Sequence, residues 1–169
     1  PIFCHDAVGT AFSHCEAVSE EAVQARVAED HEHFDVDPAL PADDHAYAVR
    51  LYLGLRAYLD ENGYAGLTAH YEDFGADGRF RQLPLLAASH LLADGYGYAA
   101  EGDAIAATLV TILGHLVGEV NFSEMYMFDL ERDAILFCHA GEGNWATAAG
   151  RPRLIDRVLS RPGMPAMAV

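Results

Sequence analysis

Three side chains that could hold a metal ion or move a proton stand in apolar surroundings: Glu101, Glu124 and His139. Glu101 belongs to "GYGYAAEGD", just before an apolar helix, so it is either a carboxylate favoured by a helix N-terminus or a metal ligand. Glu124 lies among aromatics, where an unpaired charge is costly, so it is either an edge residue open to water or a ligand. His139 is either a core histidine with satisfied hydrogen bonds or a ligand.

The spacing of two segments relates Glu124 to His139. "NFSEMYMFD" and "AILFCH" alternate with a period of two, and the short "LERD" between them predicts a hairpin. A two-residue loop at Glu131-Arg132, or a four-residue loop over 130–133, places Glu124 directly opposite His139; a three- or five-residue loop does not. Opposed Cβ atoms lie about 4.5–5.5 Å apart. One ion at about 2.0–2.2 Å from each side chain could then be shared.

The elements that must position these side chains alternate between helices and short strands. Residues 16–44 are acidic and predict a solvated helix that begins after Ser19 and includes His31-Glu32-His33. A long helix is expected over 43–61, a strand over 66–71 and a helix over 83–95. Asp103 predicts an N-cap for a helix to Val117. The stripes expected to be buried are Ala48, Leu51, Tyr52, Leu55 and Leu59 in the long helix, and Ile105, Leu109, Ile112, Leu113 and Leu116 in the last.

This order of elements predicts the α/β class, a layered domain of helices and sheet over residues 1–119. Residues 120–169 read as antiparallel strands, with two further strands and a turn in the tail. The chain stops while its last strand is still apolar, so we expect it to be truncated.

Composition excludes several functions. The net charge of −16 argues against a nucleic-acid partner, because no basic face exists to displace counterions from phosphate. All ten basic residues are arginines, which excludes a Schiff-base or P-loop lysine in this chain. The three cysteines have no CxxC spacing and are expected to be reduced, as in a cytoplasmic protein. No apolar run reaches the roughly 18 residues of a membrane span, and no membrane partner is expected.

Three motifs, in order and at similar spacing, resemble the L-arabinose isomerase family within the arabinose/fucose isomerase superfamily. They are "HYEDFGADGRFRQLPLLAASHLLADGYGYAAEGD", "FSEMYMFD" and "FCHAGEGN". The resemblance is strongest from about Thr68 to Trp145 and extends over about Asp44 to Val169. It implies the middle domain of such an enzyme followed by the first strands of its C-terminal β-barrel domain.

The resemblance also implies a site. The family's "GEGD"-like glutamate, "FMEDY"-like glutamate and "GAHMLEV"-like histidine bind a divalent metal, usually manganese, and these match Glu101, Glu124 and His139. Tyr71 matches the aromatic of the family's "NFED" motif, which lines the sugar site. The implied activity is aldose–ketose isomerisation through an enediolate, with Glu101 and Glu124 as the acid and base. The implied partners are a small sugar and further subunits of a homo-oligomer whose active site lies near a subunit interface.

The sequence departs from the family pattern in two ways. The family's fourth metal ligand is a downstream histidine, and no histidine follows His139 here. The family's N-terminal domain is also missing, and residues 1 to about 40 match only loosely. The alternatives are therefore a non-catalytic sugar- or metal-binding remnant of the family, or an unrelated acidic α/β interaction module. We expect a chain of these 169 residues alone to be inactive.

Overall fold

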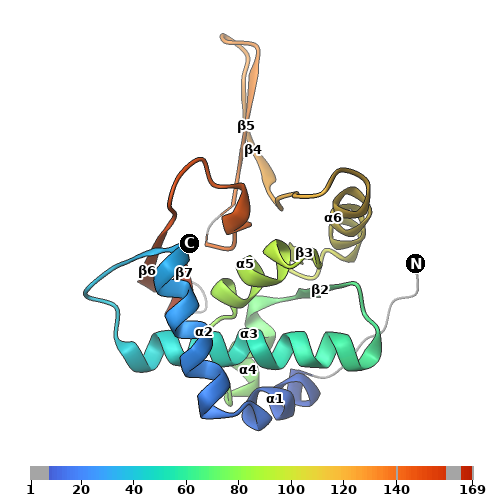
Figure 1. Cartoon of the computed structure of the whole chain (residues 1–169). Coiled ribbons are helices and arrows are strands. Elements are labelled where there is room, and N and C mark those ends of the chain that lie inside the picture. Colours follow the sequence, from blue (N-terminus) through green and yellow to red (C-terminus); the bar gives the residue numbers. More distant parts are fainter. Residues whose placement is uncertain (1–7, 140, 159–164, 169) are drawn as a thin grey trace.

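A computed structural model describes residues 8–139, 141–158 and 165–168 (Figure 1). The helices are α1 (Val8–Ala17), α2 (Glu20–His33), α3 (Ala42–Asn62), α4 (Tyr71–Asp77), α5 (Leu85–Ala93), α6 (Ala104–Val117) and the 3₁₀ turn η1 (Trp145–Thr147). The strands are β1 (Asp35–Val36), β2 (Gly66–Ala69), β3 (Gly97–Ala100), β4 (Glu124–Asp129), β5 (Ala134–Cys138), β6 (Arg153–Val158) and β7 (Pro165–Ala168). The mixture of helices and sheets confirms the α/β class.

The strands form small, separate sheets. β2 and β3 are parallel and in register from the Gly66–Gly97 pair to the Ala69–Ala100 pair. β4 and β5 form an antiparallel hairpin that projects away from the helices (Figure 1). β6 lies parallel to β1 and antiparallel to β7. The two strands predicted in the tail are therefore present, whereas the turn between them lies outside the described residues, and a β-barrel beginning here stays a prediction.

The long helix α3 is the centre of the core. It follows Pro41 and carries Asp43 and Asp44 in its first turn, where carboxylates are favoured, and it ends at Gly63 in the left-handed conformation. All five residues of the predicted stripe are buried. This face packs against α1 and α5, with α1 placed by the close approach of Cys15 to Gly54, where a Cβ would meet the Cys15 backbone at 2.4 Å.

Helix α2 is less solvated than its acidic sequence suggests. Ser19 caps it as predicted, accepting a hydrogen bond from the backbone N–H of Ala22 at 3.2 Å. His31 and His33 are exposed, which confirms that prediction. However, Val23 and Asp30 are fully buried. The expectation of a solvated helix is wrong on this face, because Asp30 pairs with Arg26 of the same helix and with His45 of α3 and His90 of α5, which the sequence alone does not bring together.

Helix α6 begins at the predicted cap, since the Asp103 carboxylate accepts from the N–H of Ala106 at 2.8 Å. Its predicted buried stripe is wrong: Ile105 is 82% and Leu116 is 73% exposed. The helix instead turns Ala107 and Val110 inward. A Cβ on Gly97 would lie 2.5 Å from the carbonyl oxygen of Ala107, so β3 and α6 pack backbone to backbone through their small residues. The helix is apolar nearly all round, and periodicity therefore does not select its inner face.

Two helices were not expected. α1 lies in a segment without a clear apolar period, and α4 begins at Tyr71, where the predicted strand over 66–71 should still continue. The strand ends at Ala69 because the His70 ring accepts a hydrogen bond from the N–H of Glu72 at 3.3 Å and starts a helix. Within the described residues, no helix is long and apolar enough to cross a membrane.

Candidate active site

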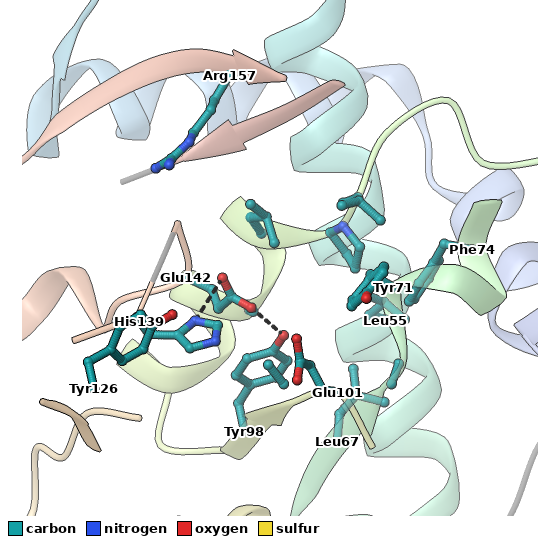
Figure 2. A pocket seen from close by; sticks show the side chains of 16 residues that line it. Leu55, Leu67, Tyr71, Phe74, Tyr98, Glu101, Tyr126, His139, Glu142 and Arg157 are labelled. Atoms are coloured by element: carbon teal, nitrogen blue, oxygen red, sulfur yellow. Dashed lines mark hydrogen bonds and ion pairs between the residues drawn. The ribbon is translucent and has the colours of Figure 1, made fainter. Parts of the chain in front are cut away.

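A cavity of about 340 Å³ opens beyond the C-terminal ends of the parallel strands β2 and β3 (Figure 2). Its floor is apolar and includes Leu55, Leu67 and Phe74. Its polar lining is supplied by Tyr71, Tyr98, Glu101, Tyr126, His139, Glu142 and Arg157. In open α/β sheets the carboxyl ends of parallel strands are where ligands bind, since the loops that follow them converge there. A cavity of this size accommodates a small polar molecule.

Glu101 lies directly after β3 in an unusual backbone conformation. Its φ is 58°, and Gly102 follows with φ 83°. The left-handed region is costly for a residue with a Cβ, and such strain is concentrated at functional sites. Asp103, not Glu101, caps α6. The carboxylate of Glu101 is exposed and lines the cavity, so it has no structural role as the helix cap.

The hairpin that carries Glu124 and His139 has a bulge. The loop spans 130–133, one of the two lengths that predicted a direct Glu124–His139 pair, and Asp129 pairs with Ala134. The register then shifts between Met125 and Met127, so Glu124 pairs with Cys138 instead. The predicted register is wrong by one residue because Tyr126 is an extra residue in β4. The two side chains nevertheless meet, with Oε2 of Glu124 3.9 Å from Nε2 of His139.

His139 is largely buried and contacts groups from three directions. Its ring packs edge-on against Phe122 with 4.9 Å between centroids. Its Nε2 faces Glu124, and its Nδ1 lies 3.3 Å from Oε2 of Glu142. The contact with Glu142 raises the pKa of His139 above its usual value, against the burial that lowers it. The histidine is therefore neither an isolated core residue nor a solvated one.

Four polar residues that line the cavity were not predicted from the sequence: Tyr98, Tyr126, Glu142 and Arg157. Two of them, Tyr98 and Glu142, bond to each other. Glu142, only 4% exposed, lies three residues after His139, and its Oε1 accepts a hydrogen bond from the hydroxyl of Tyr98 at 3.0 Å. Burial raises the pKa of Tyr98 well above that of an ordinary tyrosine, and the carboxylate of Glu142 acts in the same direction. Both residues stand in the quoted motifs, "GYGYAAEGD" and "FCHAGEGN", but a carboxylate beside glycines gives no local signal of burial.

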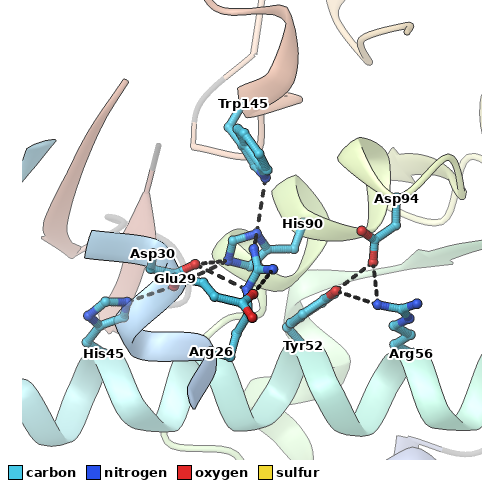
Figure 3. Close-up of polar contacts among 9 residues, drawn as sticks. All are labelled: Arg26, Glu29, Asp30, His45, Tyr52, Arg56, His90, Asp94 and Trp145. Atoms are coloured by element: carbon cyan, nitrogen blue, oxygen red, sulfur yellow. Dashed lines mark hydrogen bonds and ion pairs between the residues drawn. The ribbon is translucent and has the colours of Figure 1, made fainter. Parts of the chain in front are cut away.

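The segment after Glu142 is fixed by polar contacts to the stretch that follows α6 and to α5, whose His90 in turn contacts α2 (Figure 3). The side chain of Asn144 donates to the Val120 carbonyl at 2.8 Å, and the indole N–H of Trp145 donates to Nδ1 of His90 at 3.1 Å. Nδ1 of His90 also accepts from Arg26 at 2.8 Å, so the ring proton is on Nε2, which faces Oδ1 of Asp30 at 3.1 Å. Burial lowers the pKa of His90, in agreement with a neutral ring.

The side chains at the cavity are of the types that bind a divalent metal, and some of them are close enough together to share one ion. Carboxylate oxygens and an imidazole nitrogen are the ligands that Mn²⁺ accepts. Two ligands of one ion, each about 2.1 Å from it, can lie up to roughly 4 Å apart, so the Glu124–His139 separation is within reach. Glu101 lines the same cavity as His139. Among the residues described, however, no group of three potential ligands is already close enough to hold an ion.

Comparison with known proteins places these features in a family. Residues 4–119 match the family model of the L-arabinose isomerase central domain. L-arabinose isomerase of Nocardioides sp. is 39% identical over 123 residues, which are 69% of this chain and 24% of that protein. Those of Arthrobacter sp. and Clostridium beijerinckii are 37% and 32% identical, over 80% and 86% of this chain and 28% and 30% of theirs.

The fold and cavity define an α/β protein with a carboxylate–imidazole site at the ends of parallel strands. The chain belongs to the L-arabinose isomerase family, a family of aldose–ketose isomerases. It spans about a quarter to a third of the length of these relatives.

Proposed function

We propose that this chain forms part of the active site of a metal-dependent aldose–ketose isomerase that acts on L-arabinose or a related pentose. The observation that carries the proposal is the cavity, which Glu101 and His139 line and beside which Glu124 faces His139, in a chain of this family. Tyr71, on the other side of the cavity, supplies an aromatic face and a hydroxyl for the sugar.

Glu101, Glu124 and His139 would hold the divalent metal, manganese in this proposal, together with a further ligand from outside the described residues. When bound, such an ion supplies Lewis-acid polarisation of the sugar carbonyl and so lowers the barrier to an enediolate. The other steps of the reaction would be carried out by side chains of this chain.

Those side chains would move protons and orient the sugar. Conversion of an aldose to a ketose takes a proton from C2 and returns one to C1, while the hydroxyl proton passes from O2 to O1. In this proposal Glu101, which lines the cavity, and Glu124, which lies beside His139, accept and return these protons. The apolar floor formed by Leu55, Leu67 and Phe74 excludes water, and Arg157 of β6 supplies hydrogen-bond donors for the hydroxyls at the far end (Figure 2).

The test is an isomerase assay on the full-length protein with a panel of aldopentoses and aldohexoses, with and without added Mn²⁺. Conversion of L-arabinose or a related pentose to its ketose, dependent on Mn²⁺, is the expected result. Absence of conversion of every sugar in the panel would overturn the proposal.

One observation favours a second candidate, a family member that binds a sugar without converting it. Among the described residues no three ligands are assembled, whereas the cavity is formed. The same assay separates the two functions when it is paired with calorimetric titration of the sugars. Binding without conversion supports the second candidate, and binding with conversion excludes it.

A further inference from the structure

A chain of buried polar contacts links the strand that precedes Glu101 to the histidine of the site. Tyr98 of β3, 6% exposed, donates its hydroxyl proton to Oε1 of Glu142 at 3.0 Å. The other oxygen of Glu142 lies 3.3 Å from Nδ1 of His139. Within the described part of the chain this buried nitrogen makes no hydrogen bond of good geometry, so the Glu142 carboxylate is the group that faces it. The contacts are visible in Figure 2.

The direction of these contacts fixes where the proton of the imidazole must be. A carboxylate can only accept, so the nitrogen facing Glu142 is the one that carries hydrogen in a neutral ring. Nε2 also faces a carboxylate, but at 3.9 Å Oε2 of Glu124 is beyond hydrogen-bond distance, so the lone pair belongs to Nε2, on the side of the cavity. The edge-on packing of Phe122 restricts rotation of the ring between these two partners.

We propose that Glu142, held in place by Tyr98, is a positioning residue that keeps His139 with its proton on Nδ1 and its Nε2 lone pair directed into the cavity. This inference rests on the proposed function, because Nε2 is then the nitrogen available to a divalent metal. Partners of this kind orient ligating histidines, and their loss typically lowers metal affinity about 10–100-fold. In this arrangement Glu142 and Tyr98 act on the ion through the orientation of His139.

The variant Glu142→Gln separates positioning from packing, since it keeps the size of the side chain. Tyr98 has its hydroxyl proton to donate, so the glutamine turns its oxygen toward Tyr98 and its NH₂ group toward His139. That NH₂ group requires Nδ1 to accept, which moves the ring proton to Nε2. In Tyr98→Phe/Glu142→Gln the glutamine is free to turn over and offer its oxygen to Nδ1–H again. The double variant should therefore recover the Nδ1–H form of His139 that Glu142→Gln loses.

The first measurement needs no metal. In full-length protein labelled with ¹⁵N-histidine, the ring shifts of His139, assigned by comparison with His139→Gln, are recorded at alkaline pH, where the ring is neutral. We expect the Nδ1–H form in the parent, the Nε2–H form in Glu142→Gln and a return to Nδ1–H in the double variant. The same tautomer in the parent and in Glu142→Gln would overturn the inference, whether or not the protein proves to be an isomerase.

The second measurement is the affinity for Mn²⁺, followed by electron paramagnetic resonance of the free ion. Glu142→Gln should bind about 10–100-fold more weakly than the parent, and the double variant should bind more tightly than Glu142→Gln. Glu119→Gln, which removes one negative charge from an exposed position, is the matched control and should bind like the parent. Equal affinity of the parent and Glu142→Gln would contradict the inference. A parent that binds no Mn²⁺ would contradict the proposed function alone, because the tautomers are measured separately.

Discussion

At the scale of single residues, the two carboxylates with proposed catalytic roles have different surroundings. Glu101 is exposed on a left-handed turn at the cavity rim, whereas Glu124 is half-buried beside His139. The strained turn sets the direction of Glu101, whereas Glu124 faces the imidazole of His139. Their proposed roles as acid and base need both positions at once.

Replacement of either carboxylate tests these roles. Glu101→Gln and Glu124→Gln should each lower kcat about 100-fold or more, the usual effect of removing a general acid or base. Both keep the size of the side chain, so the unfolding midpoint should change little. Steady-state kinetics of the full-length enzyme, with Glu119→Gln as the control, provide the measurement. A variant with parental kcat would remove that residue from the mechanism.

The buried residue Asp30 governs a pH dependence of stability. Burial alone would raise the pKa of Asp30, but hydrogen bonds from His45 and His90 and the charge of Arg26 lower it to about 2. A carboxyl whose pKa is lowered by folding contributes stability above its unfolded pKa of 3.8 and loses it as the pH falls through about 2. A shift of this size corresponds to about 2 kcal/mol of stability at neutral pH.

Asp30→Asn should therefore be destabilised at neutral pH and should lack the part of the acid sensitivity that Asp30 contributes. The difference in free energy of unfolding between the parent and Asp30→Asn should be full above about pH 5 and should shrink as the pH falls toward 2. Urea unfolding at a series of pH values measures it. Glu32→Gln, an exposed position on the same helix, serves as the control. A difference that stays constant with pH would show that the pKa of Asp30 is not lowered by folding as described.

At the scale of elements, the packing of α6 on β3 depends on Gly97. A Cβ at this position would lie 1.9 Å from Oγ1 of Thr111 and 2.5 Å from the Ala107 carbonyl oxygen. Gly97→Ala should therefore push α6 away from the strand that ends at Glu101, at a cost of about 1–3 kcal/mol. Gly150→Ala, where a Cβ meets nothing within 4 Å, should leave stability nearly unchanged. Denaturant unfolding of both variants checks the contrast, and similar stabilities would contradict it.

Local signals in the sequence predicted where a helix begins better than they predicted which side of the helix is buried. Ser19 and Asp103 were predicted as caps because a capping side chain bonds only its own first turn. The face that α6 buries depends on what β3 presents to it, and the long apolar side chains of α6 outnumber the small ones that pack. Helix α4 was missed because its N-cap, His70, is not one of the residue types that are preferred at helix N-caps.

The site was also predicted only in part. The four residues matched to the family include three that line the cavity, Tyr71, Glu101 and His139, with Glu124 in contact with His139. The bulge at Tyr126 has no sequence signal, because it is one extra residue in a segment that alternates normally. Glu142 and Tyr98 could not be paired from sequence, since 44 residues separate them and only the fold brings them together.

At the scale of the whole molecule, the described residues form two apolar surfaces that face solvent. One is the outer face of α6, and the other is the hairpin of β4 and β5. The exposed side chains of the hairpin are Met125, Tyr126, Met127, Phe128, Leu130, Ile135, Leu136 and Phe137. Large exposed apolar patches are typical of surfaces that contact another molecule, and we expect these two to contact other protein in the full-length enzyme. The hairpin holds Glu124 and His139 near its base, so the order of the site depends on what supports these strands.

We expect the isolated 169-residue chain to bind Mn²⁺ weakly and to convert no sugar measurably. Each position without a protein ligand is left to water, which loosens the geometry, and an open cavity admits water to the carbonyl. Titration of Mn²⁺ into this chain and into the full-length protein, with an isomerase assay of both, makes the comparison. Comparable turnover by the two would show that the site assigned here is complete without other residues.

Trp145 gives the molecule an optical signal of its own. It is the only tryptophan in the 169 residues, and it lies three residues after Glu142 with its ring 5.7 Å from that of Phe34. Because indole emission shifts to longer wavelength when the ring enters water, the fluorescence of this chain reports whether the segment that follows the site histidine is seated on α5. Denaturation followed by the emission of Trp145 can be compared with denaturation followed by circular dichroism of the helices. The comparison would reveal whether that segment detaches before the helical core unfolds.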